Sequence, residues 1–321
     1  MGLFGSYSGD EFLGLNLPKR KFLVDRMLRE KDSVLVIGGE KAGKSLLLQQ
    51  LIFSLTNGET PFLDHYEIAR ECKVSLVAIE GELVDAQDRW KRMMRTLDFK
   101  RENFQLIFSE PLGLEREDNA RRLTKTIEDF HTPDVLIFDP LYFCFNGSLS
   151  DDAIVRRFLG HIRVMKDRFN CAIIIVHHTH RIKFNPKTGK LVDEGDDAMF
   201  GSSALKWWPD HLLMFTFNKE TMVRDFRCST QRSGDILDHL QLKLVQPDPL
   251  YFSHLDSEDM SNGLRICEIL SHIPSGLNAN ELCDRLNISK PTFYRDIKPA
   301  IHSGRVCKTE TCRPVIYFLK M

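Results

Sequence analysis

The chain has 321 residues, enough for about two domains on the usual size relation. Its hydrophobic content of 42% and charged content of 28% are those of an ordinary globular protein, which excludes an intrinsically disordered chain. The net charge of −1 conceals a basic end, because nine Lys or Arg and five acidic residues follow Ser261 and give that part a charge of +4.

Membrane insertion and secretion are not indicated by the apolar segments of the chain. The longest apolar runs, such as 134–145, are far shorter than a membrane span, and the first residues lack the charged and apolar regions of a secretory signal. The eight cysteines are scattered, and several lie inside apolar stretches, as reduced core cysteines do. We therefore expect a cytoplasmic protein with no membrane partner.

Short β-branched runs alternate with amphipathic helical stretches through the first two thirds of the chain. The runs that predict strands are 33–38, 74–79, 134–139 and 171–176. The stretches that predict helices include 45–56, 83–97 and 151–169. Strands that alternate with helices predict an α/β fold with a mainly parallel sheet covered on both faces.

The pattern changes after residue 211, where further strand-like runs are separated only by short polar turns. These runs predict antiparallel strands that extend the sheet. Residues 246–262 are rich in Pro, Ser and Asp, which is typical of a linker. The predicted organisation is an N-terminal segment, an ATPase-type α/β domain, a linker and a small C-terminal domain, at 1–20, 21–245, 246–262 and 263–321.

A phosphate-binding motif follows the first predicted strand and opens a helix. The pattern G-x-x-x-x-G-K-[ST] is formed by Gly38, Gly39, Glu40, Lys41, Ala42, Gly43, Lys44 and Ser45, and Leu46 starts the helical run behind it. Its glycines let backbone N–H groups surround phosphates, and the helix N-terminus favours negative charge. We expect this loop to bind ATP, with Lys44 at the β- and γ-phosphates and Ser45 on Mg²⁺.

Acidic residues end two of the predicted strands, at the edge of the sheet where open α/β proteins bind ligands. Asp139 ends the run 134–139, and we expect its carboxylate to hold the Mg²⁺ shell, although it could instead cap the turn before Pro140. Glu80 follows the run 74–79 and is the candidate that orients the attacking water. Glu82, two residues later, is the competing candidate.

The fourth strand leads into three histidines within four residues, His177, His178 and His180. A zinc site is one interpretation, but no Cys or carboxylate follows at ligand spacing. A second interpretation is that the histidines belong to the core. The third, which we favour, is a polar strand end that senses the γ-phosphate.

The order of these motifs resembles the RecA/DnaB superfamily, and within it the RepA-like hexameric helicase branch, over roughly residues 20–245. Glu80 is followed nine residues later by Arg89, as in the family's glutamate-then-arginine helix, and His178 stands at the family's sensor position. Two later segments, Gly201–Leu205 with Asp210, and Ser229–Gly234, are also similar to family motifs. The resemblance implies a RecA-like core in which Arg89 belongs to the nucleotide site.

The same resemblance implies a ring in which ATP lies between subunits, so we expect a homo-oligomer, as a hexamer. Arg232 is the candidate arginine finger for a neighbour's site, with Arg224 and Arg227 as rivals and a solvated turn arginine as the alternative. The chain departs from the family pattern at Thr230, where a Lys is common, and at Phe200, where a basic residue is common.

The C-terminal part resembles a winged helix-turn-helix domain. Helical stretches at 263–273 and 278–287, and a third from Ser289, precede two strand-like runs in 305–320. The third helix is the expected recognition helix, and the last strands form the wing. The residues expected to contact DNA are Lys290, Thr292, Tyr294, Arg295, Lys298 and, on the wing, Arg313.

These features together indicate an ATP-dependent DNA-binding protein. The first hypothesis is an oligomeric helicase or translocase ATPase of the RepA-like kind, acting in DNA replication or in the maintenance of mobile elements. The alternative is a non-motor, ATP-gated DNA-binding regulator or loader with weak ATPase activity. A small-molecule kinase is disfavoured, because the histidine pair and the C-terminal domain would then be unexplained.

Overall fold

A computed structural model gives the positions of most of the chain. The residues that it describes are 6–17, 19–78, 81–108, 111–178, 202–218, 222–232, 237–254, 266, 269–270, 273, 275–286, 288–297, 301, 306–309 and 315–319.

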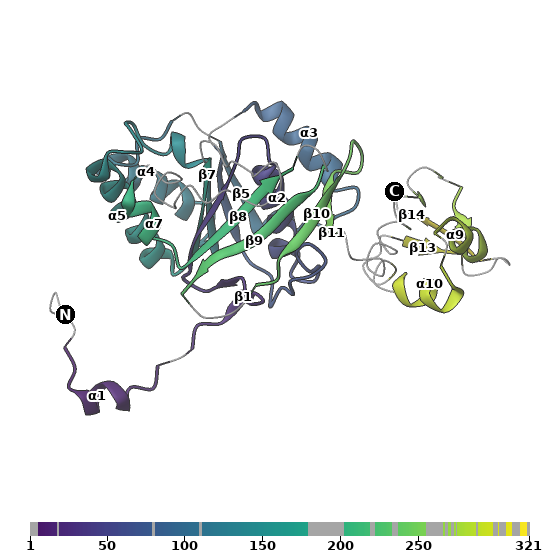
Figure 1. The fold of residues 1–321 in the computed structure, drawn as a ribbon, viewed down its shortest axis with the longest axis horizontal. Helices are drawn as coiled ribbons and strands as arrows, with labels where there is room; N and C mark the ends of the chain where they lie inside the picture. The colour runs from purple at the N-terminus through teal and green to yellow at the C-terminus, as the bar shows by residue number, and fades with distance from the viewer. Residues whose placement is uncertain are drawn as a thin grey trace, which may run out of the picture.

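A nine-stranded sheet forms the centre of the fold, in the order β11-β10-β9-β8-β3-β7-β6-β4-β5 (Figure 1). Six strands run parallel: β3 (Ser33–Gly38), β4 (Val74–Ala78), β5 (Phe104–Phe108), β6 (Val135–Asp139), β7 (Ala172–His178) and β8 (His211–Phe217). The antiparallel extension consists of β9 (Arg224–Gln231), β10 (Leu240–Val245) and β11 (Tyr251–His254). The predicted mainly parallel sheet with antiparallel additions is confirmed.

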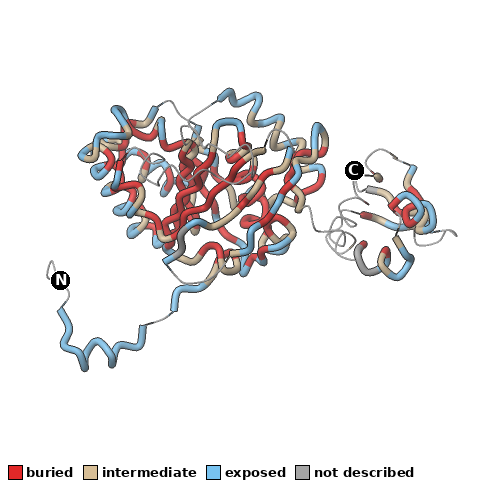
Figure 2. Tube along the Cα trace, in the orientation of Figure 1, coloured by how far each residue is buried: buried red, intermediate tan, exposed pale blue. Residues whose placement is uncertain are grey.

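Helices cover both faces of this sheet. One face carries α2 (Lys44–Asn57) and α3 (Leu83–Met93), and the other carries α4 (Glu117–Glu128), α5 (Asp152–Phe169) and α7 (Ser203–Trp207). Alternate residues of β3 enter the two layers: Val34 and Val36 face α2, while Leu35 and Ile37 face α5. The central strands are therefore buried on both sides, as Figure 2 shows.

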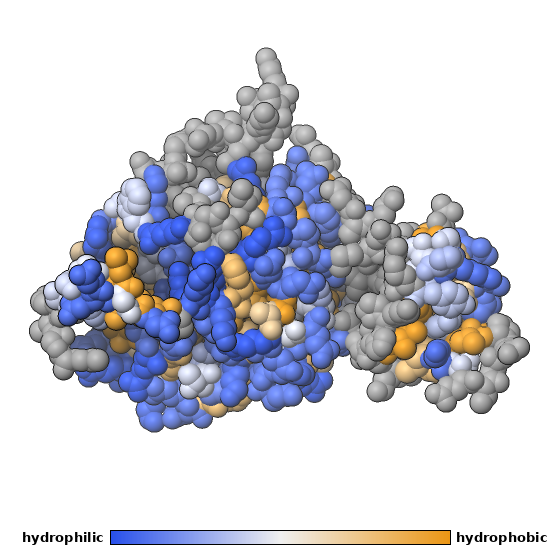
Figure 3. Space-filling view, turned by 90° about the horizontal axis from the view of Figure 1, so that it is seen from below, coloured by the Kyte–Doolittle hydropathy of each residue, from blue (hydrophilic) through white to orange (hydrophobic). Residues whose placement is uncertain are grey.

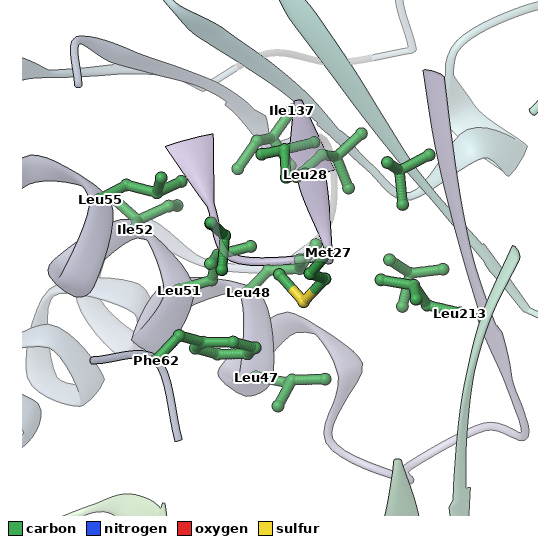
Figure 4. Packing of buried hydrophobic residues seen from close by; sticks show 14 of the residues in the cluster. Met27, Leu28, Leu47, Leu48, Leu51, Ile52, Leu55, Phe62, Ile137 and Leu213 are labelled. Atoms are coloured by element: carbon green, nitrogen blue, oxygen red, sulfur yellow. The ribbon is translucent and has the colours of Figure 1, made fainter. Parts of the chain in front are cut away.

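The α2 side of the core is closed by a small hairpin, β1 (Phe22–Val24) and β2 (Leu28–Arg29). Met27 and Leu28 from this hairpin lie against Leu47, Leu48 and Leu51 of α2 in one apolar cluster (Figure 4). Burial of this many large side chains supplies most of the free energy that holds α2, and with it the loop before α2, against the sheet. The surface seen in Figure 3 is mostly hydrophilic, with hydrophobic residues in small separate areas.

Local signals fix the ends of the helices that matter for the site. Helix α2 begins after Gly43 and ends before Gly58, whose φ of 77° is the left-handed conformation that glycine adopts without strain. Helix α5 is capped by Asp151, whose carboxylate accepts hydrogen bonds from the N–H groups of Ala153 and Ile154. The predicted helices 45–56 and 151–169 agree with these bounds, whereas the helix predicted at 83–97 already ends at Met93.

Residues 251–254, which the sequence analysis places in a linker, form β11 at the edge of the sheet. Tyr251 and Phe252 are buried there, and Phe252 exchanges hydrogen bonds with the Gln50 side chain. The two adjacent aromatic residues gave a weak strand signal, because only four residues form the strand and Pro and Asp residues precede it. The start of the linker therefore needs correction, and the other domain boundaries stay predictions.

The C-terminal part has its own small apolar core, around Leu282, Phe293 and Tyr317. It contains α9 (Ala279–Leu286), α10 (Lys290–Asp296) and a three-stranded sheet of β12 (Leu277–Asn278), β14 (Ile316–Leu319) and β13 (Val306–Lys308). Asn278 and Glu281 exchange side chain-to-backbone hydrogen bonds, which form a capping box at the start of α9.

The N-terminal helix α1 (Gly9–Gly14) lies apart from the sheet, and none of its residues is buried (Figure 1). The 3₁₀ turns η1 (Arg101–Asn103) and η2 (Leu141–Phe143) complete the elements described around the sheet. Among the helices of the described ranges, none is both long enough and apolar enough to cross a membrane.

Candidate functional site

The residues of the predicted phosphate-binding loop, together with Asp139 and His178, meet at the carboxyl edge of the parallel strands. In the strand register, Gly38 of β3 lies beside His178 of β7, and Ala78 of β4 lies beside Asp139 of β6. Because parallel strands end at the same edge, the loop after β3 faces both His178 and Asp139. Sequence and topology together thus create one site from segments far apart in the chain.

The loop between β3 and α2 depends on glycine at two positions. A Cβ on Gly38 would lie 1.9 Å from the backbone oxygen of Phe215, so only glycine lets β3 approach β8 this closely. Gly43 has a φ of +101°, and a Cβ there would lie 2.9 Å from the Phe252 ring. Lys41 adopts a φ of 59°, so the loop curls in the way that turns N–H groups toward an anion.

Lys44 lies inside this loop and is only 3% exposed. Its Nζ donates hydrogen bonds to the carbonyl oxygens of Gly38 and Gly39, both at 2.8 Å, and lies 3.0 Å from Nδ1 of His178. Since an ammonium group only donates, Nδ1 must be the acceptor and the ring proton is on Nε2. If the Lys44 ammonium moved, His178 would therefore lose this hydrogen bond.

A hollow of about 350 Å³ opens between the loop and the strand ends. Its polar wall is formed by Lys41, Gly43, Lys44, Ser45, Asp139 and His178. Its apolar wall, between α2 and α3, is formed by Leu46, Leu76, Ala78, Ala86, Trp90, Leu106, Phe108 and Pro140, with Gln49, Gly81 and Arg89 among them. The hollow has room for a phosphate chain beside the loop and for a larger group beyond it.

Ser45 and Asp139 face the same hollow with the oxygen donors that Mg²⁺ prefers. One hydroxyl and one carboxylate fit an ion that takes its other ligands from water and phosphates, rather than a closed protein cage. In the described ranges, no three His, Cys, Asp or Glu side chains gather in a cluster that could hold a metal. Behind Asp139, burial and the nearby carboxylate raise the pKa of the Cys144 thiol, so this cysteine stays protonated.

The candidate bases differ in what the structure says of them. Glu80 lies outside the described residues, as does His180 of the histidine group. Glu82 is exposed at the N-terminus of α3, and its side chain makes no capping hydrogen bond. The structure thus leaves the role of Glu80 a prediction, with Gly81 beside it lining the hollow.

The three arginines considered as fingers occupy different environments. Arg224 is 7% exposed, and its Nε donates to the carbonyl oxygen of Ala42 in the same chain's loop, which ties it to its own site. Burial lowers the pKa of this guanidinium. Arg227 is half-buried and contacts Met214.

Arg232 is exposed and lies at the opposite edge of the sheet from the loop. Its N–H donates to the Asp210 carbonyl at 3.0 Å, and its guanidinium contacts the carboxylate of Asp210 and the carbonyl of Trp207. Asp210 itself pairs with Ser33, the first residue of β3, whereas the loop follows the last. Arg232 therefore cannot reach the hollow of its own chain.

Three of the six residues predicted to contact DNA, Lys290, Thr292 and Tyr294, have described side chains, and all three belong to α10. Lys290 and Tyr294 are exposed, Thr292 is half-buried, and Ser289 caps the helix. Arg295 belongs to α10, but its side chain lies outside the described residues, as do Lys298 and Arg313. The expected contacts of all six residues stay predictions.

Gln49 and Trp90 line the hollow but were not among the residues predicted from the sequence. A signal existed for Gln49, because two glutamines interrupt the apolar run of α2 and buried amides need partners. Trp90 gave no comparable signal, since an aromatic residue on an amphipathic helix usually belongs to the hydrophobic core.

The loop, the hollow and the sheet order define a P-loop nucleotide-binding protein. A family model described as an AAA domain matches residues 8–181, more than half of the chain. The chain belongs to this AAA-domain family of P-loop ATPases, which implies nucleotide binding, usually with Mg²⁺, and indicates ATPase activity.

The fold is also similar to a solved structure, the KaiC-like protein PH0186 from the hyperthermophilic archaeon Pyrococcus horikoshii OT3. The TM-score is 0.50 at 12% identity, over 74% of this chain and 98% of that one. A likeness at this identity shows the fold alone, and it confirms the predicted RecA-like core. A search of the curated proteins found no match to the sequence.

Proposed function

We propose that this protein is an ATP-dependent DNA-binding protein, an oligomeric helicase or translocase ATPase of the RepA-like kind. The observation that carries the proposal is the meeting of Lys44, Ser45, Asp139 and His178 at one hollow. These are the groups that phosphoryl transfer to water requires for binding the phosphates, holding Mg²⁺ and detecting the γ-phosphate.

ATP binding would change the partners of Lys44. The ammonium now held by Gly38, Gly39 and His178 would turn toward the β- and γ-phosphates, while Ser45 and Asp139 hold Mg²⁺. The freed Nδ1 of His178 would then be able to interact with the γ-phosphate. His178 is the last residue of β7. A change in its hydrogen bonds when ATP binds would therefore also act on the segment of chain that follows β7.

The position of Arg232 supports an oligomer. An exposed arginine at the far edge of the sheet has no route to its own nucleotide, but a head-to-tail contact would place it at the hollow of the next subunit. Such contacts close into rings when the rotation between subunits allows it. A hexameric ring is the assembly proposed here.

DNA contact is assigned to the C-terminal part, as a winged helix-turn-helix. The exposed Lys290 and Tyr294 on α10, behind a serine N-cap, suit a helix that meets the phosphate backbone and a groove. The charge of +4 on residues 262–321 is favourable for a polyanion.

A second candidate function is a non-motor, ATP-gated DNA-binding regulator or loader. The observation that favours it is Thr230, which lies in β9 two residues before Arg232, at a position where the resembling helicases often carry a lysine. Loss of that charge would weaken the coupling between hydrolysis and DNA movement while leaving ATP and DNA binding intact.

ATP turnover measured with and without single-stranded DNA, together with strand displacement on a forked duplex, tests the proposal. We expect single-stranded DNA to raise turnover at least about tenfold, an effect of 1.4 kcal/mol on the barrier, and the duplex to be unwound. ATP-dependent binding of DNA without unwinding would instead establish the regulator. Absence of both turnover and DNA binding would contradict both candidates.

The variant Arg232→Ala tests the shared site. We expect its turnover to fall by about 1000-fold, as for other arginine fingers, with nucleotide affinity nearly unchanged. Equimolar mixing of this variant with Lys44→Ala should restore part of the activity, because each subunit supplies the residue that its neighbour lacks. A mixture with no recovered turnover, or full turnover in Arg232→Ala alone, would rule out Arg232 as a finger. In that case Arg227→Ala is the next variant to measure.

A further inference from the structure

A buried acceptor at the wall of the hollow has no hydrogen-bond partner among the described residues. It is Oε1 of Gln49, a residue of α2 that is only 6% exposed. Gln49 lines the hollow together with Ser45 and Asp139. Buried polar groups in folded proteins are nearly always paired, so this acceptor indicates a donor that comes from outside the chain.

The next residue shows that α2 can also satisfy a buried amide from within the chain. Gln50 donates from Nε2 to the Phe252 carbonyl at 3.0 Å and accepts from the Phe252 N–H at 2.8 Å. Gln49 is similarly buried, but its carbonyl has no such partner in the part of the chain that the structure describes. Gln50 is therefore a structural glutamine, whereas the Gln49 carbonyl is available to a bound group.

The helical repeat places Gln49 one turn behind Ser45. Residues four apart lie on the same face of an α-helix, with their Cβ atoms about 5–6 Å from one another. Side chains on a helix also lean toward its N-terminus, so the long side chain of Gln49 leads back toward the Ser45 hydroxyl. The Gln49 carbonyl thus belongs to the side of the hollow where Ser45 and Asp139 would hold Mg²⁺.

Water molecules of the Mg²⁺ shell are the donors that suit this acceptor. Mg²⁺ takes a near-octahedral shell of oxygens and gives up water reluctantly, so at a nucleotide it keeps several water molecules. Each of these turns its oxygen to the ion and can only donate outward, so it needs an acceptor in the protein. We propose that Gln49 accepts a hydrogen bond from one water molecule of this shell and thereby positions the ion between Ser45 and Asp139.

This inference rests on the proposed nucleotide site and adds a positioning residue to it. Residues that hold the outer shell of a metal orient its ligands, and their loss typically lowers metal affinity by about 10- to 100-fold. Gln49 would touch neither the phosphates nor the base. Its loss should therefore weaken the contribution of Mg²⁺ to nucleotide binding and leave the binding of metal-free nucleotide unchanged.

Calorimetric titration with a nonhydrolysable ATP analogue, once with EDTA and once with excess Mg²⁺, tests the assignment. The ratio of the two dissociation constants measures the contribution of the ion without any turnover. In Gln49→Met, which keeps the side-chain length but has no carbonyl, this ratio should fall about tenfold. Its affinity for the metal-free analogue should stay within about twofold of the wild-type value, which also shows that the loop is folded. Gln49→Glu should keep at least the wild-type ratio, because a carboxylate is a stronger acceptor and cannot donate.

Gln87→Met is the matched control, because Gln87 is an exposed glutamine on α3 that accepts a hydrogen bond from Lys91. It should keep the wild-type ratio. An unchanged ratio in Gln49→Met, or an equal fall in Gln49→Met and Gln49→Glu, would overturn the role of Gln49 alone. Failure of the wild type to bind the analogue, with or without Mg²⁺, would overturn the nucleotide site and this inference together.

Discussion

Replacing Lys44 by alanine is expected to lower ATP turnover by at least about 100-fold, the usual cost of removing one preorganised donor from a developing charge. Lys44 is buried in the loop, so its ammonium is held beside the place where a phosphate would bind. In the alanine variant, a water molecule could not supply the lost positive charge. The measurement is steady-state phosphate release at saturating magnesium and ATP, with ATP affinity measured in parallel.

Lys41→Ala is the control from the same loop. Lys41 also lines the hollow, but it is exposed, so its charge is screened by water and its loss should change turnover by less than about threefold. Wild-type turnover in Lys44→Ala would mean that the chemistry, if any, occurs elsewhere. Equal losses in the two variants would mean that the loop tolerates no change, and would remove the special role of Lys44.

Replacing Gly38 by alanine is expected to lower the free energy of unfolding by about 3 kcal/mol, the upper part of the range for overpacking. The added Cβ would meet the Phe215 carbonyl at 1.9 Å, and both atoms belong to neighbouring central strands. Neither strand can move away without breaking its other ladder, so the strain cannot be relieved locally. Chemical denaturation followed by circular dichroism measures the change.

Gly39→Ala provides a control one residue away, because a Cβ at Gly39 would meet nothing within 4 Å. Its free energy of unfolding should stay within about 0.5 kcal/mol of the wild-type value. If the two alanine variants unfolded at the same denaturant concentration, the close approach of β3 to β8 would be wrong.

The sequence specified the main sheet well because its central strands are continuous apolar runs. Each of β3, β6 and β7 is buried on both faces, so its apolar composition alone identifies it as a strand. Strand β5 and helix α4 were not predicted. The reason is visible for β5: only one of its five residues is buried, as expected at the edge of a sheet.

The polar wall of the hollow could be predicted from the sequence, whereas the wall that Gln49 and Trp90 line could not. Parallel strands end at one edge, so a motif after β3 and an acid at the end of β6 must come together. The place of Gln49 in this hollow depends on how α2 and α3 face one another, which no local sequence pattern determines. The same holds for Arg232, whose distance from its own hollow follows from the antiparallel pairing of β9 with β8.

The polar contacts of Arg232 lie at the start of β3, at the opposite end of this strand from the phosphate-binding loop. Asp210 contacts Arg232 and also accepts from the Ser33 N–H at 2.9 Å, at the start of the strand whose other end carries the loop. In the proposed ring, β3 would be a rigid link between a subunit's own nucleotide and the arginine that it offers to a neighbour. Hydrolysis around a ring would need such a link.

A structure determined with magnesium and a nonhydrolysable ATP analogue bears most directly on the central claim, that a triphosphate is bound and cleaved where the Gly38–Ser45 loop meets the strand ends. We expect the phosphates on that loop, Lys44 turned away from the Gly38 and Gly39 carbonyls, and the metal between Ser45 and Asp139. An analogue bound at another place, or a hollow without nucleotide at saturating concentration, would contradict the claim.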